Sequence, residues 1–180
     1  MTPLIRVFIS IPIPDPSPLG CMTSELKGIK GVRISPENQI HLTLKFIGDI
    51  DSGKIPKISE AVRKAVQGEK PFEIVLKGVG AFPKEKNARV IWVGAEPADI
   101  LRRISDRIGA NLGGIPFDQK PFKSHITVGR CSDPRDVSGF LEGYREKEFL
   151  RFGCGEILVM KSELLKTGAK HSVLERISLT

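Results

Sequence analysis

The order of apolar and polar residues along the chain shows two periodicities. Every second residue from Ile5 to Ile11 is isoleucine or valine, and a period of two is typical of a β-strand. In residues 51–68, the apolar positions are spaced by three and four, which predicts an amphipathic helix. The chain therefore mixes strands with helices.

The same two periodicities predict elements along the whole chain. The predicted strands cover residues 4–11, 39–47, 72–79, 89–93, 122–128, 156–164 and 173–179. The predicted helices cover residues 19–29, 51–68, 97–112 and 133–144. Because several strands alternate apolar and polar positions, we expect an α+β fold with one-sided antiparallel sheets. No linker rich in proline, glycine or serine divides the sequence, so we expect one domain over residues 1–180.

Composition narrows the class of protein. The 180 residues include 28 Lys and Arg against 21 Asp and Glu, and the net charge of +7 points to a polyanion such as RNA or DNA. The charges are mixed along the chain, so an ordinary solvated surface remains the alternative. No apolar run is long enough to span a membrane, and no secretory signal is visible, so we expect a cytoplasmic protein. The three scattered cysteines, Cys21, Cys131 and Cys154, favour neither a disulfide framework nor a zinc site.

A short motif occurs twice. His41-Leu-Thr43-Leu is repeated as His125-Ile-Thr127-Val, 84 positions later, and each copy lies on a predicted strand with a helix after it. Because side chains on a strand alternate between its faces, each histidine shares a face with its threonine, while the aliphatic residues face a core. The repeat predicts two pseudo-symmetric lobes with one motif each.

Two imidazoles that face each other across a cleft suit proton transfer at a phosphodiester. A neutral imidazole accepts a proton from the nucleophile and an imidazolium donates one to the leaving oxygen, because the ordinary histidine pKa of about 6.5 lets both forms coexist. The hydroxyls of Thr43 and Thr127 are suited to the non-bridging phosphate oxygens. One such motif on a strand needs no function. Two copies that use two of the three histidines in the chain favour a paired active site at His41 and His125. No cofactor and no set of metal ligands is indicated.

These residues resemble the 2H phosphoesterase superfamily, and within it the RNA 2′,3′-cyclic phosphodiesterase or 2′-5′ RNA ligase family. The resemblance extends over essentially the whole chain. The matching stretches are RVFISI at residues 6–11, PENQIHLTLKFIG at 36–48, GVGAFP at 78–83, RVIWV at 89–93, FKSHITVGR at 122–130, KSEL at 161–164 and the closing residues 168–179.

The resemblance implies two lobes of antiparallel sheet with helices on the outer faces and a positively charged central cleft. It implies opening of RNA 2′,3′-cyclic phosphate ends to 2′-phosphates, with His41 protonating the leaving 3′ oxygen and His125 activating water, although the two roles are exchangeable. The ligase name implies the reverse joining of such an end to a 5′-hydroxyl, without a nucleotide cofactor. RNA is the implied partner, tRNA halves among the candidates, and we expect a monomer.

Three further residues are candidates for substrate binding. Arg130 closes the second motif and is suited to a phosphate or a base, but strict alternation turns it away from His125 unless the strand bulges at Gly129. Phe46 is suited either to stacking on a base or to the core. His171 stands where the family often has tyrosine, and Ser124 stands where it often has proline.

Other features are less informative. Trp92 lies in an apolar strand and is expected in the core. Residues 48–54 resemble a phosphate-binding P-loop, but Ile55 replaces its Mg²⁺-binding hydroxyl. Scattered lysines are candidates for an RNA path, namely Lys84, Lys86, Lys120, Lys123, Lys166 and Lys170. Two alternatives to RNA hydrolysis stay open: a non-catalytic module that binds RNA or nucleotides, and a cyclic phosphodiesterase acting on a small nucleotide such as ADP-ribose cyclic phosphate.

Overall fold

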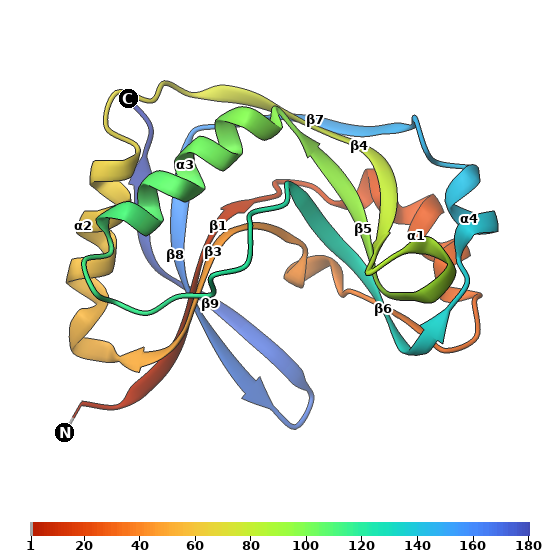
Figure 1. The fold of residues 1–180 in the computed structure, drawn as a ribbon, viewed down its shortest axis with the longest axis horizontal. Coiled ribbons are helices and arrows are strands. Elements are labelled where there is room, and N and C mark those ends of the chain that lie inside the picture. The colour runs from red at the N-terminus through yellow and green to blue at the C-terminus, as the bar shows by residue number, and fades with distance from the viewer. Residues whose placement is uncertain (1) are drawn as a thin grey trace.

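The computed structural model describes residues 2–180, which form two antiparallel sheets (Figure 1). We call them the His41 lobe and the His125 lobe, after the histidine that each contains. The sheet of the His41 lobe has the strand order β3 (His41–Asp51), β1 (Leu4–Pro12), β8 (Glu156–Leu165) and β9 (Gly168–Ser178). The sheet of the His125 lobe has the order β2 (Val32–Ile34), β6 (His125–Arg135), β5 (Ala88–Glu96), β4 (Phe72–Phe82) and β7 (Glu148–Cys154).

Helices cover the outer face of each sheet, as expected. In the His41 lobe, α2 (Ile55–Ala65) and α3 (Ala98–Asn111) pack against each other and against the sheet (Figure 1). In the His125 lobe, α1 (Gly20–Lys27) packs on β2 and β6, and the short α4 (Ser138–Glu142) lies beyond it. Four single-turn 3₁₀ helices complete the described chain: η1 (Ser17–Leu19), η2 (Glu37–Gln39), η3 (Ser52–Lys54) and η4 (Glu85–Asn87).

The hydrophobic core lies between each sheet and its helices. Leu42 and Leu44 of β3, and Ile126 and Val128 of β6, are buried there. Their alternation with histidine and threonine leaves the motif side chains on the opposite, inner face of each sheet. Burial of the aliphatic residues therefore orients both motifs toward the space between the lobes.

The chain passes between the lobes several times, because β1, β3, α2, α3, β8 and β9 belong to one lobe and the intervening strands to the other. Neither lobe is a continuous stretch of sequence. None of the helices in residues 2–180 has both the length and the apolar character needed to cross a membrane.

Some predicted elements were wrong in extent or missing. The helix predicted over residues 133–144 forms only at Ser138–Glu142, because β6 continues through Arg135 in pairing with β5. Strands β2 and β7 were not predicted. The first is three residues long, and the second carries charged residues among its apolar ones, so both depend on hydrogen bonds to neighbouring strands rather than on a clear local pattern.

Candidate active site

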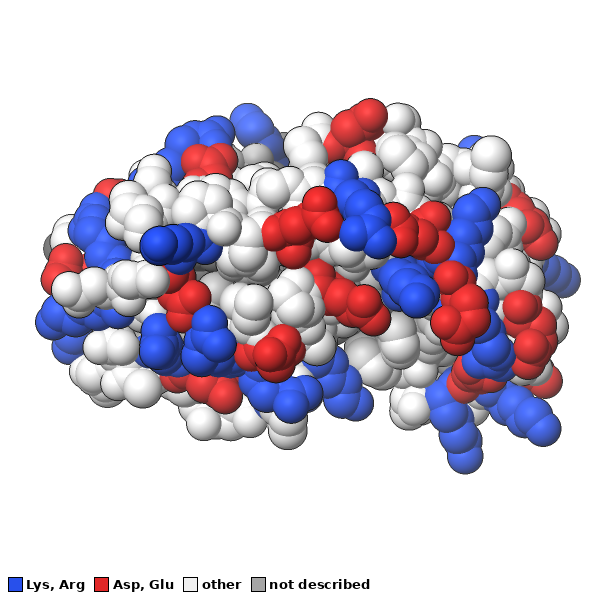
Figure 2. Space-filling model, turned by 90° about the horizontal axis from the view of Figure 1, so that it is seen from above, with Lys and Arg blue, Asp and Glu red and all other residues white. Residues whose placement is uncertain are grey.

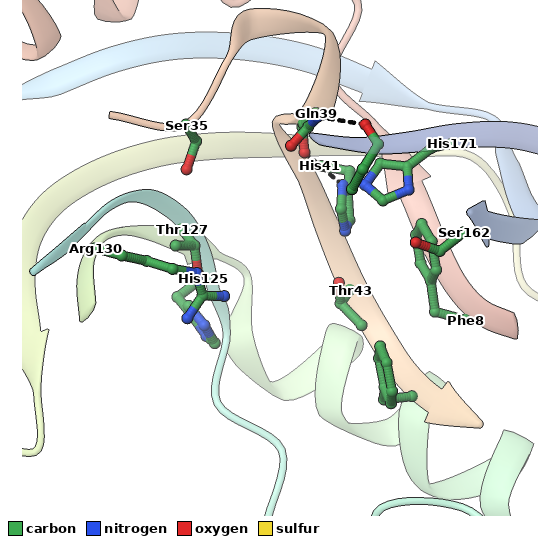
Figure 3. A pocket seen from close by; sticks show the side chains of 12 residues that line it. Phe8, Ser35, Gln39, His41, Thr43, His125, Thr127, Arg130, Ser162 and His171 are labelled. Carbon is green, nitrogen blue, oxygen red and sulfur yellow. Dashed lines mark hydrogen bonds between the residues drawn. The ribbon is translucent and has the colours of Figure 1, made fainter. Parts of the chain in front are cut away.

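The two motif strands face each other across a pocket of about 350 Å³ between the lobes (Figure 3). All four motif residues lie in it, two from β3 and two from β6. The lining residues are Phe8, Ser35, Gln39, His41, Thr43, Phe46, His125, Thr127, Arg130, Ser162, Ala169 and His171. The structure therefore brings together all seven residues that the sequence singled out for catalysis, phosphate binding or substrate binding.

Both motif histidines are tethered in the same way. The Nδ1 atom of His41 lies 2.7 Å from the carbonyl oxygen of Gln39, and the Nδ1 atom of His125 lies 2.6 Å from that of Lys123. In each case the carbonyl belongs to the residue two positions earlier. An Nδ1–H that donates to this carbonyl fixes the tautomer and leaves Nε2 free to accept a proton. The Gln39 side chain is itself held, because its Nε2 donates to the carbonyl oxygen of Ala169 at 2.6 Å.

Aromatic rings support the two imidazoles differently. The ring of His41 is stacked on Phe8 with 4.7 Å between centroids and meets the edge of His171 at 5.4 Å. The ring of His125 meets Phe82 edge-on at 5.0 Å and Trp92 at 6.3 Å. Trp92, which the sequence placed in the core, is in fact half-buried beside His125, because its strand turns that face toward the inner space rather than toward the helices.

The surroundings of His41 and His125 favour the neutral form of both imidazoles. The pKa of His41 is lowered to about 4, chiefly by burial and to a smaller extent by His171, against the opposing effect of the Gln39 hydrogen bond. Burial also lowers the pKa of His125, and the charges of Lys123 and Arg130 act in the same direction. A phosphate between the two rings would oppose these effects, because an anion stabilises imidazolium.

Matched β-bulges bring Phe46 and Arg130 into the pocket. On β3, Leu44 is skipped in the pairing with β1, and on β6, Val128 is skipped in the pairing with β5. A skipped residue reverses the alternation, so the residue three positions after each threonine returns to the face of that threonine. Arg130 thus lies with His125 and Thr127 rather than facing away (Figure 3). Phe46 is 43% exposed, which excludes a place in the core.

The carbonyl group of each skipped residue has a donor from elsewhere in the chain. The buried hydroxyl of Ser105, on α3, donates to the Leu44 oxygen at 2.6 Å. The backbone N–H of Ser35, just after β2, donates to the Val128 oxygen at 2.9 Å. These bonds stabilise both bulges, since a buried carbonyl without a partner is costly.

His171 is a third imidazole in the pocket. It lies on β9 opposite Ser162 of β8, and burial lowers its pKa. Its Nδ1 atom is buried without a hydrogen-bond partner among residues 2–180. The Ser124 hydroxyl donates to the Ala95 oxygen at 2.5 Å and ties the entry of β6 to β5.

Sequence reasoning missed five residues that line the pocket: Phe8, Ser35, Gln39, Ser162 and Ala169. Phe8 lies in a strand with buried neighbours, so its place in the sequence did not mark it as a site residue. Gln39 was marked only by its position two residues before His41. Of the candidate RNA-path lysines, Lys123 lies over the Phe82 ring at 4.7 Å, whereas none of the six lines this pocket.

The positive charge that faces the pocket comes from one side chain rather than from a basic surface. Arg130 is the one Lys or Arg among the described pocket residues, and no Asp or Glu lines the pocket. Figure 2 shows basic and acidic side chains interspersed over one face of the molecule. Within residues 2–180, no three His, Cys, Asp or Glu side chains are grouped as metal ligands.

The sequence of this chain is similar to those of known proteins. The profile of the 2′-5′ RNA ligase superfamily matches residues 25–164, and the chain belongs to that superfamily. A protein of Archaeoglobus fulgidus named RNA 2′,3′-cyclic phosphodiesterase is 31% identical over 169 residues, or 91% of this chain and 94% of the relative. A protein of the same name from Methanothermobacter thermautotrophicus is 34% identical over 148 residues, or 79% of each chain.

Solved structures of other proteins have the same fold as this chain. A crystal structure of a Thermus thermophilus protein superposes with a TM-score of 0.80 at 28% identity and covers 97% of this chain and 98% of that one. The apo crystal structure of E. coli LigT superposes with a TM-score of 0.76 at 20% identity, covers 99% of both chains, and supports the fold alone.

Proposed function

We propose that this protein is an RNA 2′,3′-cyclic phosphodiesterase that opens cyclic ends to 2′-phosphates. The observation that carries the proposal is the identical presentation of two imidazoles to one pocket, each held through Nδ1 by the carbonyl two residues earlier. Family membership and the printed names of the relatives point to the same reaction.

In the proposed reaction, Nε2 of His125 removes a proton from water as the water oxygen attacks phosphorus. The bond between phosphorus and the 3′ oxygen breaks, and the imidazolium of His41 donates its proton to that oxygen. The product is a 2′-phosphate with a free 3′-hydroxyl. Each positioned proton transfer contributes about 10²–10⁴-fold in rate. Thr43 and Thr127 are the proposed donors to the non-bridging oxygens, where charge accumulates.

The lowered pKa of His41 bears on its role as the acid. Near neutral pH this imidazole is unprotonated in the free protein. The bound phosphodiester anion raises the pKa and allows His41 to take up the proton that it later donates. Proton uptake on binding is therefore part of the proposal.

Three further residues are proposed to hold the substrate. The Arg130 guanidinium contacts phosphate, and the exposed Phe46 ring stacks on a base. His171, beside His41, contacts the substrate or tunes its neighbour. All three line the pocket, which supports these roles.

Ligation is the same chemistry with a different nucleophile. A 5′-hydroxyl replaces water at His125, the 3′ oxygen again leaves with a proton from His41, and a 2′-5′ linkage forms. The strained cyclic ester supplies the driving force for either nucleophile, so no nucleotide cofactor is required by the proposed steps.

The test is incubation of the protein, in EDTA, with a short RNA that ends in a 2′,3′-cyclic phosphate, followed by identification of the terminal phosphate. A 2′-phosphate is expected. A 3′-phosphate, or binding without a product, contradicts the proposal, and the latter favours a binding module. Competition with ADP-ribose cyclic phosphate, together with its own turnover, separates RNA from a small-nucleotide substrate. Matched His41→Ala and His125→Ala proteins control for contaminating nucleases.

A further inference from the structure

A second hollow lies beside His125, outside the central pocket. It has a volume of about 350 Å³ and is formed by the inner face of the His125 lobe and the first turns of α3. His125 borders both the hollow and the central pocket. A group placed in the hollow is therefore adjacent to the imidazole that we assign as the base.

The walls of the hollow suit a nucleobase. The rings of Phe82 and Trp92 lie side by side, with 5.4 Å between centroids and a tilt of 36°. Gly94, which is paired with His125 across β5 and β6, also lines the hollow, and a Cβ at this position would lie 2.7 Å from the carbonyl oxygen of Lys77, so the close packing of β5 on β4 requires glycine here. Aromatic faces next to open space are the usual platform for bases of a single strand.

The hollow also carries positive charge that suits a phosphate. Lys77, Arg102 and Lys123 border it, against the single carboxylate of Glu96. Among the described residues, no carboxylate lies within ion-pair distance of Arg102 or Lys123, whereas Lys77 has a loose partner in Glu146 at 3.9 Å. Basic side chains beside an aromatic wall bind the backbone and the base of one nucleotide together.

The corresponding hollow beside His41 is different. It has walls of proline and aliphatic residues, and it is bordered by Glu37 but by no lysine or arginine of the described chain. The two hollows flank the two histidines, and the basic one lies on the His125 side. Charge complementarity thus assigns an RNA segment to one side of the reacting phosphate rather than to both.

We propose that the hollow beside His125 is the subsite for the 5′-terminal nucleotide of the RNA strand that supplies the attacking 5′-hydroxyl in ligation. The inference rests on the proposed function and on the assignment of His125 to the nucleophile. In-line displacement puts the nucleophile and the leaving 3′ oxygen on opposite sides of phosphorus. The cyclic-phosphate strand then extends from the His41 side, and the acceptor nucleotide extends from the His125 side into the hollow.

The ligation step balances without another reactant. The 5′-hydroxyl gives its proton to Nε2 of His125 and its oxygen bonds to phosphorus. The bond to the 3′ oxygen breaks, and this oxygen takes the proton of His41. The base of the acceptor stacks on Phe82 and Trp92, and its next phosphate meets Arg102 and Lys123.

The experiment measures how one cyclic-phosphate RNA is divided between water and an acceptor RNA with a 5′-hydroxyl, in one tube at fixed acceptor concentration. Arg102→Gln is expected to lower the ratio of ligated to hydrolysed product about tenfold, the effect of one lost charge-assisted contact. Lys64→Ala, which removes an exposed charge from α2, is the matched control and leaves the ratio unchanged.

A second variant guards against loss of folding. Ala98 is the exposed first residue of α3 at the rim of the hollow, a position where the helix dipole tolerates a carboxylate. Ala98→Glu is expected to lower the ratio, and the neutral Ala98→Gln to lower it less, because only glutamate repels the acceptor phosphate.

The outcomes separate the two proposals. Absence of hydrolysis by the unmodified protein contradicts the proposed function itself. Hydrolysis without ligation, or an unchanged ratio in both Arg102→Gln and Ala98→Glu, overturns the acceptor subsite and leaves the proposed function standing. If a variant loses hydrolysis and ligation to the same extent, the ratio stays unchanged. That result also overturns the acceptor subsite, because it indicates that the cyclic-phosphate strand occupies the hollow.

Discussion

The His41 and His125 lobes present the same motif in different surroundings. Both motifs have the same tether at Nδ1 and the same bulge after the threonine. His41, however, is stacked on Phe8 beside another imidazole, whereas His125 lies near two cationic side chains and a basic hollow. The shared geometry presents both imidazoles to one pocket. The differences between the lobes are what can assign one imidazole to the leaving group and the other to the nucleophile.

The largest effect on turnover is expected when one imidazole is removed at a time, which tests whether the two lobes contribute separate proton transfers. We expect His41→Ala and His125→Ala each to lower turnover of the cyclic phosphate by about 10²–10⁴-fold, because each loses one proton transfer. Single-turnover rates measure the effect, and unfolding curves check that both proteins fold. Since the two groups act as a unit, the double variant should be little worse than either single one. Near-normal turnover in either single variant would refute the paired mechanism.

The residues at the two matched bulges sharpen the comparison, because one is charged and the other is aromatic. We expect Arg130→Ala and Phe46→Ala each to reduce kcat/KM for RNA by about tenfold or more, through a lost phosphate contact and a lost stacking platform. Only Arg130→Ala should also weaken the salt dependence of kcat/KM. Measurements at low and high salt distinguish the two roles, and equal salt slopes in both variants would contradict them.

The bulges also differ in their donors. Ser105→Ala removes the hydroxyl that satisfies the buried Leu44 carbonyl, and it should lower the free energy of unfolding by about 1–3 kcal/mol. Ser35→Ala keeps the backbone N–H that serves Val128, so it should have little effect on stability. Denaturant titration of the two variants provides the measurement. Equal stability losses would mean that the hydroxyl of Ser105 is not what supports its bulge.

The smallest expected effect is a shift in the pH dependence of turnover. Because burial lowers the pKa values of both His41 and His125, the bell-shaped profile of kcat/KM should be centred below pH 6.5, while that of kcat should lie at higher pH owing to the bound anion. His171→Gln removes a group that lowers the pKa of His41, so its kcat/KM profile should move to higher pH by less than about one unit. A profile of kcat/KM that is flat from about pH 5 to 9 would contradict acid–base catalysis by the pair.

Folding stability has a related pH dependence. A histidine whose pKa is lower in the folded state binds fewer protons there than in the unfolded chain. Its contribution is therefore present above the unfolded pKa of about 6.5 and is lost as the pH falls toward the folded value of about 4 for His41. This loss should be smaller in His41→Gln, which makes the same unfolding measurements a check on the buried state of the ring.

Several properties of the chain were accessible from its sequence alone. Alternation of Leu42 and Leu44 with His41 and Thr43 predicted the inner face of β3, and the second motif did the same for β6, because side-chain direction on a strand is a local property. Alternation within the strands predicted antiparallel sheets, the family resemblance implied helices on their outer faces, and the paired motifs predicted four of the residues that line the pocket. The single domain over residues 1–180, the monomer and the cytoplasmic location stay predictions.

Tertiary structure decided the rest. Whether Arg130 and Phe46 face the pocket depends on bulges, and one of these has a donor, Ser105, that lies 61 positions from Leu44 in the chain. The third imidazole, His171, reaches His41 only because β9 pairs with β8 and β8 with β1. Alternation within a strand follows from its own residues, whereas a change in register and an approach between distant strands follow from hydrogen bonds and packing with partners that no local pattern identifies.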